Sequence, residues 1–361
     1  MEPRHHGTAD AIARLKALPR IALTPLPTPL HRLARFSDSL GADIWIKRDD
    51  MGSVGLAGNK VRKYELLLGQ ALTEGADTLI TTGAVQSNSA RAGAAAAAQL
   101  GLRCVLVLTG EPPAERRANL LLDDLFGAEV RFVGRLGWSG LEPVLAAAAA
   151  EVAQAGGRPY VVPVGASSPL GSLGFALAYR ELLDQLRQAG LDLGGGDGVG
   201  DGSGAGSVAV TAQGPLLLHT TTSGGTPAGL VVGRALWGQG PRPIGVDAGR
   251  VLTDPARDLA QLATEAAAVI GLDRHFSAEQ IAVELGYAGP GYGSVTEEGL
   301  SAIRLLATTE GIVADPVYSG KGLAAVVDLA RSGRHEGRPI VFWHTGGWHA
   351  NFDPHYGDAL R

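Results

Sequence analysis

The sequence predicts an α/β protein with a mostly parallel sheet. Short runs rich in β-branched and aliphatic residues alternate along the chain with longer segments rich in Ala and Leu. That alternation is typical of parallel strands joined by covering helices. With 361 residues, 45% hydrophobic and 19% charged, the chain can form two domains or one large α/β unit with a sizeable core.

The expected elements follow one another in this alternating order. In the first half, short apolar runs predict strands at 44–47, 78–82, 104–108, 130–133 and 160–163. Longer segments between and beside them predict helices near 61–72, 87–100, 115–126 and 141–155. In the second half, strands are expected at 216–220, 243–246 and 340–344, with helices near 173–189, 228–237, 255–270, 296–308 and 322–331.

One stretch breaks the alternation. Residues 194–206 are almost wholly Gly, Asp and Ser, a composition that cannot bury a core. We therefore expect a flexible Gly/Asp/Ser-rich loop at 193–207, near a domain boundary and without chemistry of its own. Asp197 and Asp201 lack the further acidic residue that a calcium loop requires, which favours a solvated loop.

Charge and cysteine content exclude several classes of function. A formal charge of −5 argues against a nucleic acid or an anionic membrane as partner. Cys104 is the only cysteine, so an intrachain disulfide and a multi-cysteine metal site are both excluded, and its apolar neighbours favour a buried thiol. No run is apolar for long enough to span a bilayer. Because residues 1–6 lack the apolar stretch of a signal peptide, a cytoplasmic location is expected. No bound metal ion is predicted.

The segment Gly58-Asn59-Lys60-Val61-Arg62-Lys63 is the first candidate site. A lysine that binds an aldehyde must be neutral near physiological pH, and the neighbouring cations Arg62 and Lys63 are expected to lower the pKa of Lys60. The glycines before it permit a close approach of a planar ring, and Asn59 can donate a hydrogen bond to an oxygen on that ring. A polar loop that merely caps a helix remains the alternative.

The second candidate site is Thr222-Ser223-Gly224-Gly225-Thr226, between a predicted strand and a predicted helix. Free backbone N–H groups at a helix start, together with the positive end of the helix dipole, attract a phosphate. The segment has neither the Gly-Lys-Ser/Thr of a nucleoside-triphosphate loop nor the Gly-x-Gly-x-x-Gly of dinucleotide binders. A small phosphate monoester fits it better, and an ordinary strand–helix turn is the alternative.

Three further segments complete the pattern. Gln86-Ser87-Asn88-Ser89 begins a predicted helix, where Ser87 and Asn88 can bind a substrate carboxylate, cap the helix, or do both. Ser87 is also a catalytic candidate, for proton transfer or as a nucleophile. Tyr292 and Tyr318 each stand on a Gly- or Pro-rich turn, where a tyrosine can stack on a cofactor or move a proton. The Thr345 hydroxyl can hydrogen-bond a pyridine nitrogen. An amine, a phosphate cradle and a polar turn together suit pyridoxal 5'-phosphate (PLP).

Taken in order, these segments resemble the D-cysteine desulfhydrase and 1-aminocyclopropane-1-carboxylate (ACC) deaminase family of fold type II PLP enzymes. The motifs that carry the resemblance cover nearly the whole chain: Thr24-Pro25-Leu26-Pro27-Thr28-Pro29-Leu30, Ile46-Lys47-Arg48-Asp49-Asp50, Gly58-Asn59-Lys60, Gln86-Ser87-Asn88, Pro163-Val164-Gly165-Ala166-Ser167-Ser168, Ser223 to Leu230, Gly291-Tyr292-Gly293, Asp315-Pro316-Val317-Tyr318 and His344-Thr345-Gly346-Gly347.

The resemblance implies two three-layer α/β/α domains with PLP in the cleft between them. We expect a large PLP-binding domain from 1–60 and 190–361, a small domain at 61–189, and a homodimer. Lys60 would bind the cofactor and move the Cα proton, Asn59 would contact the ring oxygen, and residues 222–226 would hold the phosphate. Ser87 and Asn88, with Gln86 and Ser89 beside them, would face a small amino-acid substrate, while Tyr292 and Tyr318 would line the pocket.

The resemblance also indicates a branch of the family. Desulfhydrases place a threonine of a His-Thr-Gly-Gly segment at the pyridine nitrogen, as Thr345 would be here, whereas deaminases use a glutamate directly after the second tyrosine. That position is Ser319 in this chain, which favours β-elimination by a D-cysteine desulfhydrase-like lyase. Alternatives are an ACC deaminase, an L-cysteate sulfo-lyase-like enzyme and a non-catalytic ligand-binding homologue. Ser89, Trp348 and His349 depart from the family pattern at positions expected near the substrate.

Overall fold

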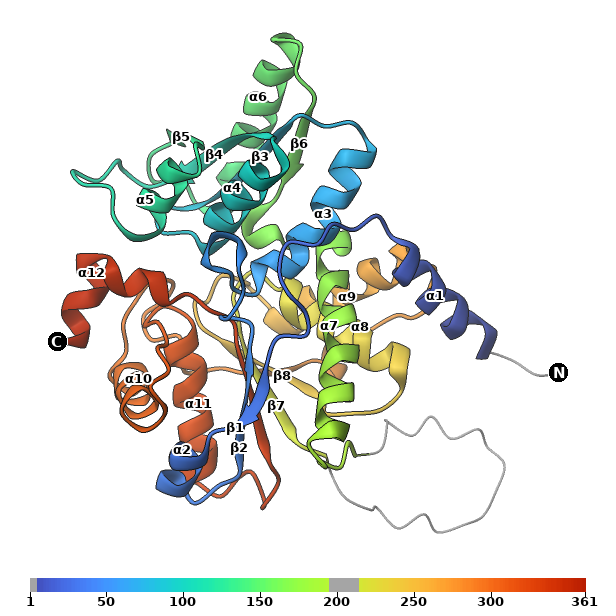
Figure 1. Ribbon diagram of the computed structural model, residues 1–361, viewed down its shortest axis with the longest axis vertical. Coiled ribbons are helices and arrows are strands. Elements are labelled where there is room, and N and C mark those ends of the chain that lie inside the picture. Colours follow the sequence, from blue (N-terminus) through green and yellow to red (C-terminus); the bar gives the residue numbers. More distant parts are fainter. Residues whose placement is uncertain (1–4, 195–213) are drawn as a thin grey trace.

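The computed structural model describes residues 5–194 and 214–361, which fold around two sheets (Figure 1). The larger sheet has the strand order β1-β2-β10-β7-β8-β9, and only its edge strand β1 runs antiparallel. Its strands are β1 Leu30–Arg32, β2 Ile44–Arg48, β7 Leu216–Thr221, β8 Pro243–Asp247, β9 Ala282–Glu284 and β10 Ile340–His344. The smaller sheet, with the order β5-β4-β3-β6, is parallel throughout. Its strands are β3 Thr78–Ala84, β4 Arg103–Thr109, β5 Glu129–Phe132 and β6 Pro159–Val162.

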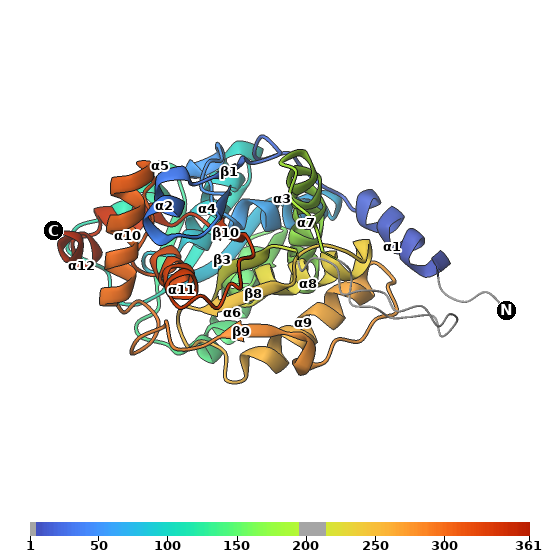
Figure 2. The ribbon, with the colours of Figure 1, turned by 90° about the horizontal axis from the view of Figure 1, so that it is seen from below.

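Helices cover both sheets on both faces, so the expected α/β class with two three-layer units is confirmed (Figures 1 and 2). The helices are α1 His5–Ala17, α2 Ala34–Leu40, α3 Lys60–Thr73, α4 Asn88–Leu100, α5 Ala118–Leu125, α6 Leu141–Gln154, α7 Pro169–Gln188, α8 Gly225–Trp237, α9 Pro255–Val269, α10 Glu297–Glu310, α11 Ser319–Arg331 and α12 Pro354–Gly357.

Strand β10 shows why the sequences of the central strands are continuous apolar runs. All five of its residues are buried, because both faces of the large sheet are covered. Phe342 packs with α2, α10 and α11 on one face, whereas Trp343 packs with Phe175 and Leu230, from α7 and α8, on the other. Figure 2 shows these two groups of helices on opposite sides of the strands.

Helix α4 lies close to the small sheet because its buried face is built from alanine and glycine. Ala90, Ala94 and Ala97 are fully buried against the core that includes Leu79 and Leu106 of the strands. A Cβ added at Gly93 would lie 2.7 Å from the hydroxyl of Tyr64, so α3 and α4 can approach one another only with a glycine there.

All predicted strands and helices are present with bounds shifted by a few residues. The edge strands β1 and β9 were not predicted, because three residues are too few to show a strand pattern. Helices α1, α2 and α12 were also missed. The boundaries of the two predicted domains stay a prediction, and most of the predicted loop at 193–207, with Asp197 and Asp201, lies outside the described residues.

Candidate active site

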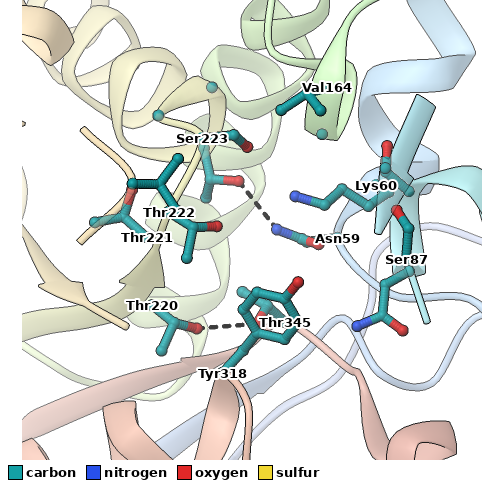
Figure 3. A pocket seen from close by; sticks show the side chains of 18 of the residues that line it. Asn59, Lys60, Ser87, Val164, Thr220, Thr221, Thr222, Ser223, Tyr318 and Thr345 are labelled. Carbon is teal, nitrogen blue, oxygen red and sulfur yellow. Dashed lines mark hydrogen bonds between the residues drawn. The ribbon is translucent and has the colours of Figure 1, made fainter. Parts of the chain in front are cut away.

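A cavity lies between the two sheets, at the carboxyl ends of β3, β7 and β10 (Figure 3). Open α/β sheets bind ligands at this edge, because the loops and helix starts that follow the strands converge there. Helices α3, α4 and α8 all begin at the cavity. The side chains that line it include Asn59, Lys60, Lys63, Ser87, Asn88, Ser89, Trp138, Thr220, Thr221, Thr222, Ser223, Thr226, Val251, Tyr292, Tyr318 and Thr345.

Lys60 is the first residue of α3, and its amine points into the cavity (Figure 3). The turn before it requires a glycine: Gly58 has a φ of 113°, and a Cβ there would lie 3.2 Å from the carbonyl oxygen of Thr345. The N–H of Asn59 donates to that same oxygen at 3.0 Å. The start of α3 is therefore fastened to the end of β10, which sets the position of Lys60.

Burial lowers the pKa of Lys60 to about 8, so a substantial fraction of the amine is neutral near physiological pH. Burial is the cause of this shift, and the contributions expected from Arg62 and from Lys63 are both absent. The Arg62 guanidinium bonds Asp49 at 2.8 Å and Glu181 at 2.9 Å, and these carboxylates neutralise its charge. The effect between the two lysines is on Lys63, whose pKa lies well below the usual value because of burial first and the charge of Lys60 second.

The turn from β7 into α8 forms the expected cradle. Gly224 has a φ of 88°, and α8 begins at Gly225. The Ser167 hydroxyl accepts from the Gly225 N–H at 3.1 Å and lies 2.9 Å from the Ser223 hydroxyl. This arrangement exposes small polar groups and a helix N-terminus to the cavity, as a phosphate requires.

Lys63 completes the cradle, and the sequence interpretation had not assigned it to the site. Its Nζ lies 3.1 Å from the Ser167 hydroxyl and 3.2 Å from the carbonyl oxygen of Gly165. A Cβ at Gly225 would lie 2.6 Å from that Nζ. The sequence could have pointed to Lys63 through its spacing of three residues from Lys60, because this spacing places both lysines on one face of a helix.

Two hydrogen bonds between side chains lie in the cavity lining, and Figure 3 marks both with dashed lines, one from Asn59 and one between Thr220 and Thr345. The Asn59 Nδ2 donates to the Thr226 hydroxyl at 3.0 Å, and the hydroxyls of Thr345 and Thr220 are 3.1 Å apart. Thr220 was not predicted. No carboxylate lines the cavity within the described residues.

Ser319 does not reach the cavity lining. Its hydroxyl is fully buried, accepts from the Asp315 N–H at 2.8 Å and donates to the Asp315 carboxylate. The bonds that hold it belong to the turn leading into α11, so Ser319 and Thr345 have separate roles in this structure.

Ser87 caps α4 and lines the cavity at the same time. Its hydroxyl accepts from the Ala90 N–H at 3.2 Å, and Asn88 and Ser89 line the cavity beside it. The structure does not bring Gln86 into the cavity, because its Nε2 donates to the Asp353 carboxylate and to the Arg117 carbonyl. Its side chain therefore lies outside the cavity in which the substrate is expected.

Trp348 and His349 also lie outside the cavity lining. The two rings stack on one another with centroids 3.9 Å apart, which turns them toward their own short helix, Trp348–Phe352. His349 is buried, and this burial, with Arg91 as the second cause, lowers its pKa to about 3. The expected substrate contact of Trp348 is not present in this structure.

Tyr292 and Tyr318 meet at the cavity, with their hydroxyl oxygens 2.6 Å apart. Burial raises the pKa of both, and of Tyr318 well above the usual value, so both phenols keep their protons at neutral pH. Trp138 packs edge-on against Tyr292 at 5.2 Å between ring centroids. Trp138 belongs to the small-sheet half and was not predicted, since nothing near it in sequence marks a site.

These residues fit PLP. A neutral amine, a cradle of small residues with a lysine beside it, and hydroxyl and amide groups between them match the aldehyde, phosphate and ring of that cofactor. No cluster of three or more His, Cys, Asp or Glu suited to a metal ion occurs among the described residues. Nor is any helix described here long and apolar enough to cross a membrane.

Comparison with known proteins agrees with this geometry. A D-cysteine desulfhydrase from Klebsiella pneumoniae subsp. pneumoniae is 40% identical over 355 residues, covering 96% of this chain and 99% of that protein. A 1-aminocyclopropane-1-carboxylate deaminase from Burkholderia vietnamiensis is 37% identical over 344 residues, covering 92% and 95%. A crystal structure described as an ACC deaminase homologue is 37% identical, with a TM-score of 0.80 over 100% of this chain and 99% of that one.

More distant structures share the fold alone. The processed form of threonine deaminase isoform 2 from Solanum lycopersicum is 15% identical, with a TM-score of 0.63. The family model described as pyridoxal-phosphate dependent enzyme matches residues 21–346, which is most of the chain. The chain therefore belongs to the family of pyridoxal-phosphate dependent enzymes.

Proposed function

We propose that this enzyme is a D-cysteine desulfhydrase-like lyase that eliminates the β-substituent of a small amino acid and releases a 2-oxo acid and ammonia. The observation that carries the proposal is the pair Thr345 and Thr220 in a cavity whose described lining has no carboxylate. A neutral hydroxyl at the pyridine nitrogen leaves that nitrogen largely unprotonated, because only an acid partner favours the pyridinium. This is the arrangement of the desulfhydrase branch.

Bound PLP would act as an electron sink for the bonds at the substrate Cα. Lys60 would bind the cofactor and, once displaced by the substrate amine, would take the Cα proton on its own Nζ. Its lowered pKa suits that role, because a base is most effective when its pKa lies near the working pH. Asn59 would hold the ring oxygen, while residues 222–226 and Lys63 would hold the phosphate.

The substrate would lie between the start of α4 and the tyrosine pair. Ser87 and Asn88 stand at a helix N-terminus that attracts the substrate carboxylate. Tyr292 and Tyr318 keep their protons and share a hydrogen bond, so one of them can deliver a proton toward the departing group. Ser89 would limit the space beside the substrate.

ACC ring opening is the second candidate, because relatives at 37% identity carry that name. An L-cysteate sulfo-lyase differs only in its leaving group. The test is a screen of D-cysteine, L-cysteine, L-cysteate, D-serine, 3-chloroalanine and ACC for 2-oxo acid and ammonia release. We expect D-cysteine or another β-substituted amino acid to be the preferred substrate. Preference for ACC would refute the main proposal, and no product from any of them with PLP bound would support a non-catalytic homologue.

We also propose a homodimer. Its support is an exposed apolar surface: Leu121 and Leu125 lie four residues apart on α5, and Phe352 stands on the neighbouring C-terminal segment. We expect Leu125→Glu to produce monomers in analytical ultracentrifugation, while Val161→Glu, at an exposed residue of β6, leaves the mass unchanged. A cytoplasmic location stays a prediction of the sequence, and cell fractionation tests it.

A further inference from the structure

Asn119, in the first turn of α5, fastens the turn between β3 and α4. Its side chain is fully buried. Its Nδ2 donates to the backbone carbonyl of Gln86 and to Oδ1 of Asn88, at 2.9 Å in both cases. Its backbone N–H donates to Oε1 of Gln86, also at 2.9 Å. Three hydrogen bonds therefore join one residue of α5 to two residues of the turn.

The backbone sets the polarity of these contacts. The carbonyl oxygen of Gln86 can only accept a hydrogen bond, so Asn119 must turn its NH2 group toward it. The second hydrogen of that NH2 points at Asn88, which must accept it through Oδ1. The Nδ2 of Asn88 is thereby turned away from α5, toward Gly347 and the cavity that Asn88 lines.

Gln86 braces the same turn from the other side. Its Nε2 donates to the Asp353 carboxylate at 2.9 Å and to the Arg117 carbonyl at 3.1 Å. Both Nε2 and Oε1 of Gln86 form hydrogen bonds, which restrain the residue. Its backbone carbonyl is therefore held in place to accept from Asn119. The orientation of Asn88 thus depends on a buried residue 31 positions further along the chain.

We propose that Asn119 is a positioning residue that fixes the Asn88 amide with its NH2 toward the substrate carboxylate. The inference rests on the proposed function, which places that carboxylate at Ser87 and Asn88. An NH2 group attracts a carboxylate and an amide oxygen repels it, so a reversed Asn88 would replace an attractive contact by a repulsive one. Asn119 does not line the cavity and acts on it through Asn88, whose amide it orients, with Gln86 as the second anchor.

The test compares two unreactive ligands of the PLP-loaded enzyme. D-Alanine has the carboxylate and D-alaninamide lacks its charge, and neither has a β leaving group. Dissociation constants come from titration of the cofactor's visible absorbance. For Asn119→Leu, which keeps the branched shape and removes the side-chain donors, we expect roughly 10- to 100-fold weaker binding of D-alanine, the range for a hydrogen bond to a charged group. Binding of D-alaninamide and the PLP content should stay within about 2-fold of the unmodified enzyme.

Leu120→Ala is the matched control, because Leu120 is the adjacent, fully buried residue of α5 and its side chain has no polar group. It should lower the melting temperature through its cavity and leave the ratio of the two dissociation constants unchanged. Asn119→Ala, which has no side-chain donor, serves if the Leu variant fails to fold. An unchanged ratio in the Asn119 variants, or an equal loss for both ligands, would overturn the inference. An unmodified enzyme that responds spectrally to no amino acid would refute the proposed function and the inference with it.

Discussion

The Nζ of Lys63 lies 3.1 Å from the hydroxyl of Ser167, and this contact joins the helix that carries Lys60 to the cradle at the start of α8. Lys63 is fully buried beside groups that carry no negative charge, so its pKa lies well below the usual value. A phosphate in the cradle would supply the missing counter-charge. We therefore expect different roles for the two lysines on one face of α3, one toward the cofactor's aldehyde and one toward its phosphate.

Lys63→Met should weaken binding of pyridoxine 5'-phosphate, which has the phosphate but no aldehyde to react with Lys60. Removing a charged hydrogen bond predicts a loss of roughly 10- to 100-fold, measured by isothermal titration of the apoprotein. Pyridoxine, which lacks the phosphate, should bind equally to both proteins. Equal loss for both compounds would contradict the assignment of Lys63 to the phosphate.

Lys60→Ala should abolish covalent attachment of PLP and lower turnover by at least about 1,000-fold, because it removes both the attachment point and the base. The fold should persist, since the residue faces the cavity. Borohydride reduction followed by peptide mass spectrometry should place the pyridoxyl group on Lys60 in the unmodified enzyme. An adduct on Lys47, Lys63 or Lys321 would refute the assignment.

The stability of the apoprotein should depend on pH through Lys60. Burial lowers its pKa to about 8, below the ordinary lysine value of 10.5, so the unfolded chain binds more protons between these two values. Stability therefore rises with pH across that window, and Lys60 destabilises the fold below it. Denaturant titrations at pH 7 and pH 10 should show that Lys60→Met is stabilising at pH 7 and that its advantage shrinks toward pH 10. If the difference in unfolding free energy between Lys60→Met and the unmodified protein does not change with pH, burial does not lower the pKa of Lys60.

Thr345→Val should weaken PLP retention and slow turnover, because the variant removes the hydroxyl paired with Thr220 in the cavity. Ser319→Ala should have a milder effect on both. Its cost should appear in the melting temperature, since it removes buried hydrogen bonds to Asp315 worth about 1 kcal/mol each. Dialysis against cysteine-free buffer and steady-state kinetics measure the two properties. A larger catalytic loss from Ser319→Ala would contradict the desulfhydrase-like placement.

Ser89→His should shift preference toward D-cysteine relative to the best substrate found in the screen. Ser89 is buried and lines the cavity, so a longer side chain there extends a hydrogen-bonding arm toward the substrate. The measured quantity is the ratio of kcat/KM values, with PLP content as the check on folding. If the ratio does not change, Ser89 only packs in the first turn of α4, and Trp138 becomes the next residue to test.

The sequence by itself determined the alternation of strands and helices and the identity of the main site segments. Those features are local: an apolar run predicts a central strand, and small residues between a strand and a helix predict an anion cradle. Lys60 and residues 222–226 could be named for this reason. Strands β1 and β9 could not, because three residues at a sheet edge carry no pattern of their own.

Only the tertiary structure decided which groups meet. Lys63 and Ser167, Thr220 and Thr345, and Asn119 and Asn88 are 104, 125 and 31 positions apart, and each pair forms because different strands and helices end at one cavity. Gln86 and Trp348 were expected at the substrate and are held elsewhere by Asp353 and His349. The cause of the lowered pKa of Lys60 was likewise a tertiary property. Burial depends on what packs around a side chain, whereas the charges beside it in sequence, such as Arg62, can be neutralised by partners far along the chain.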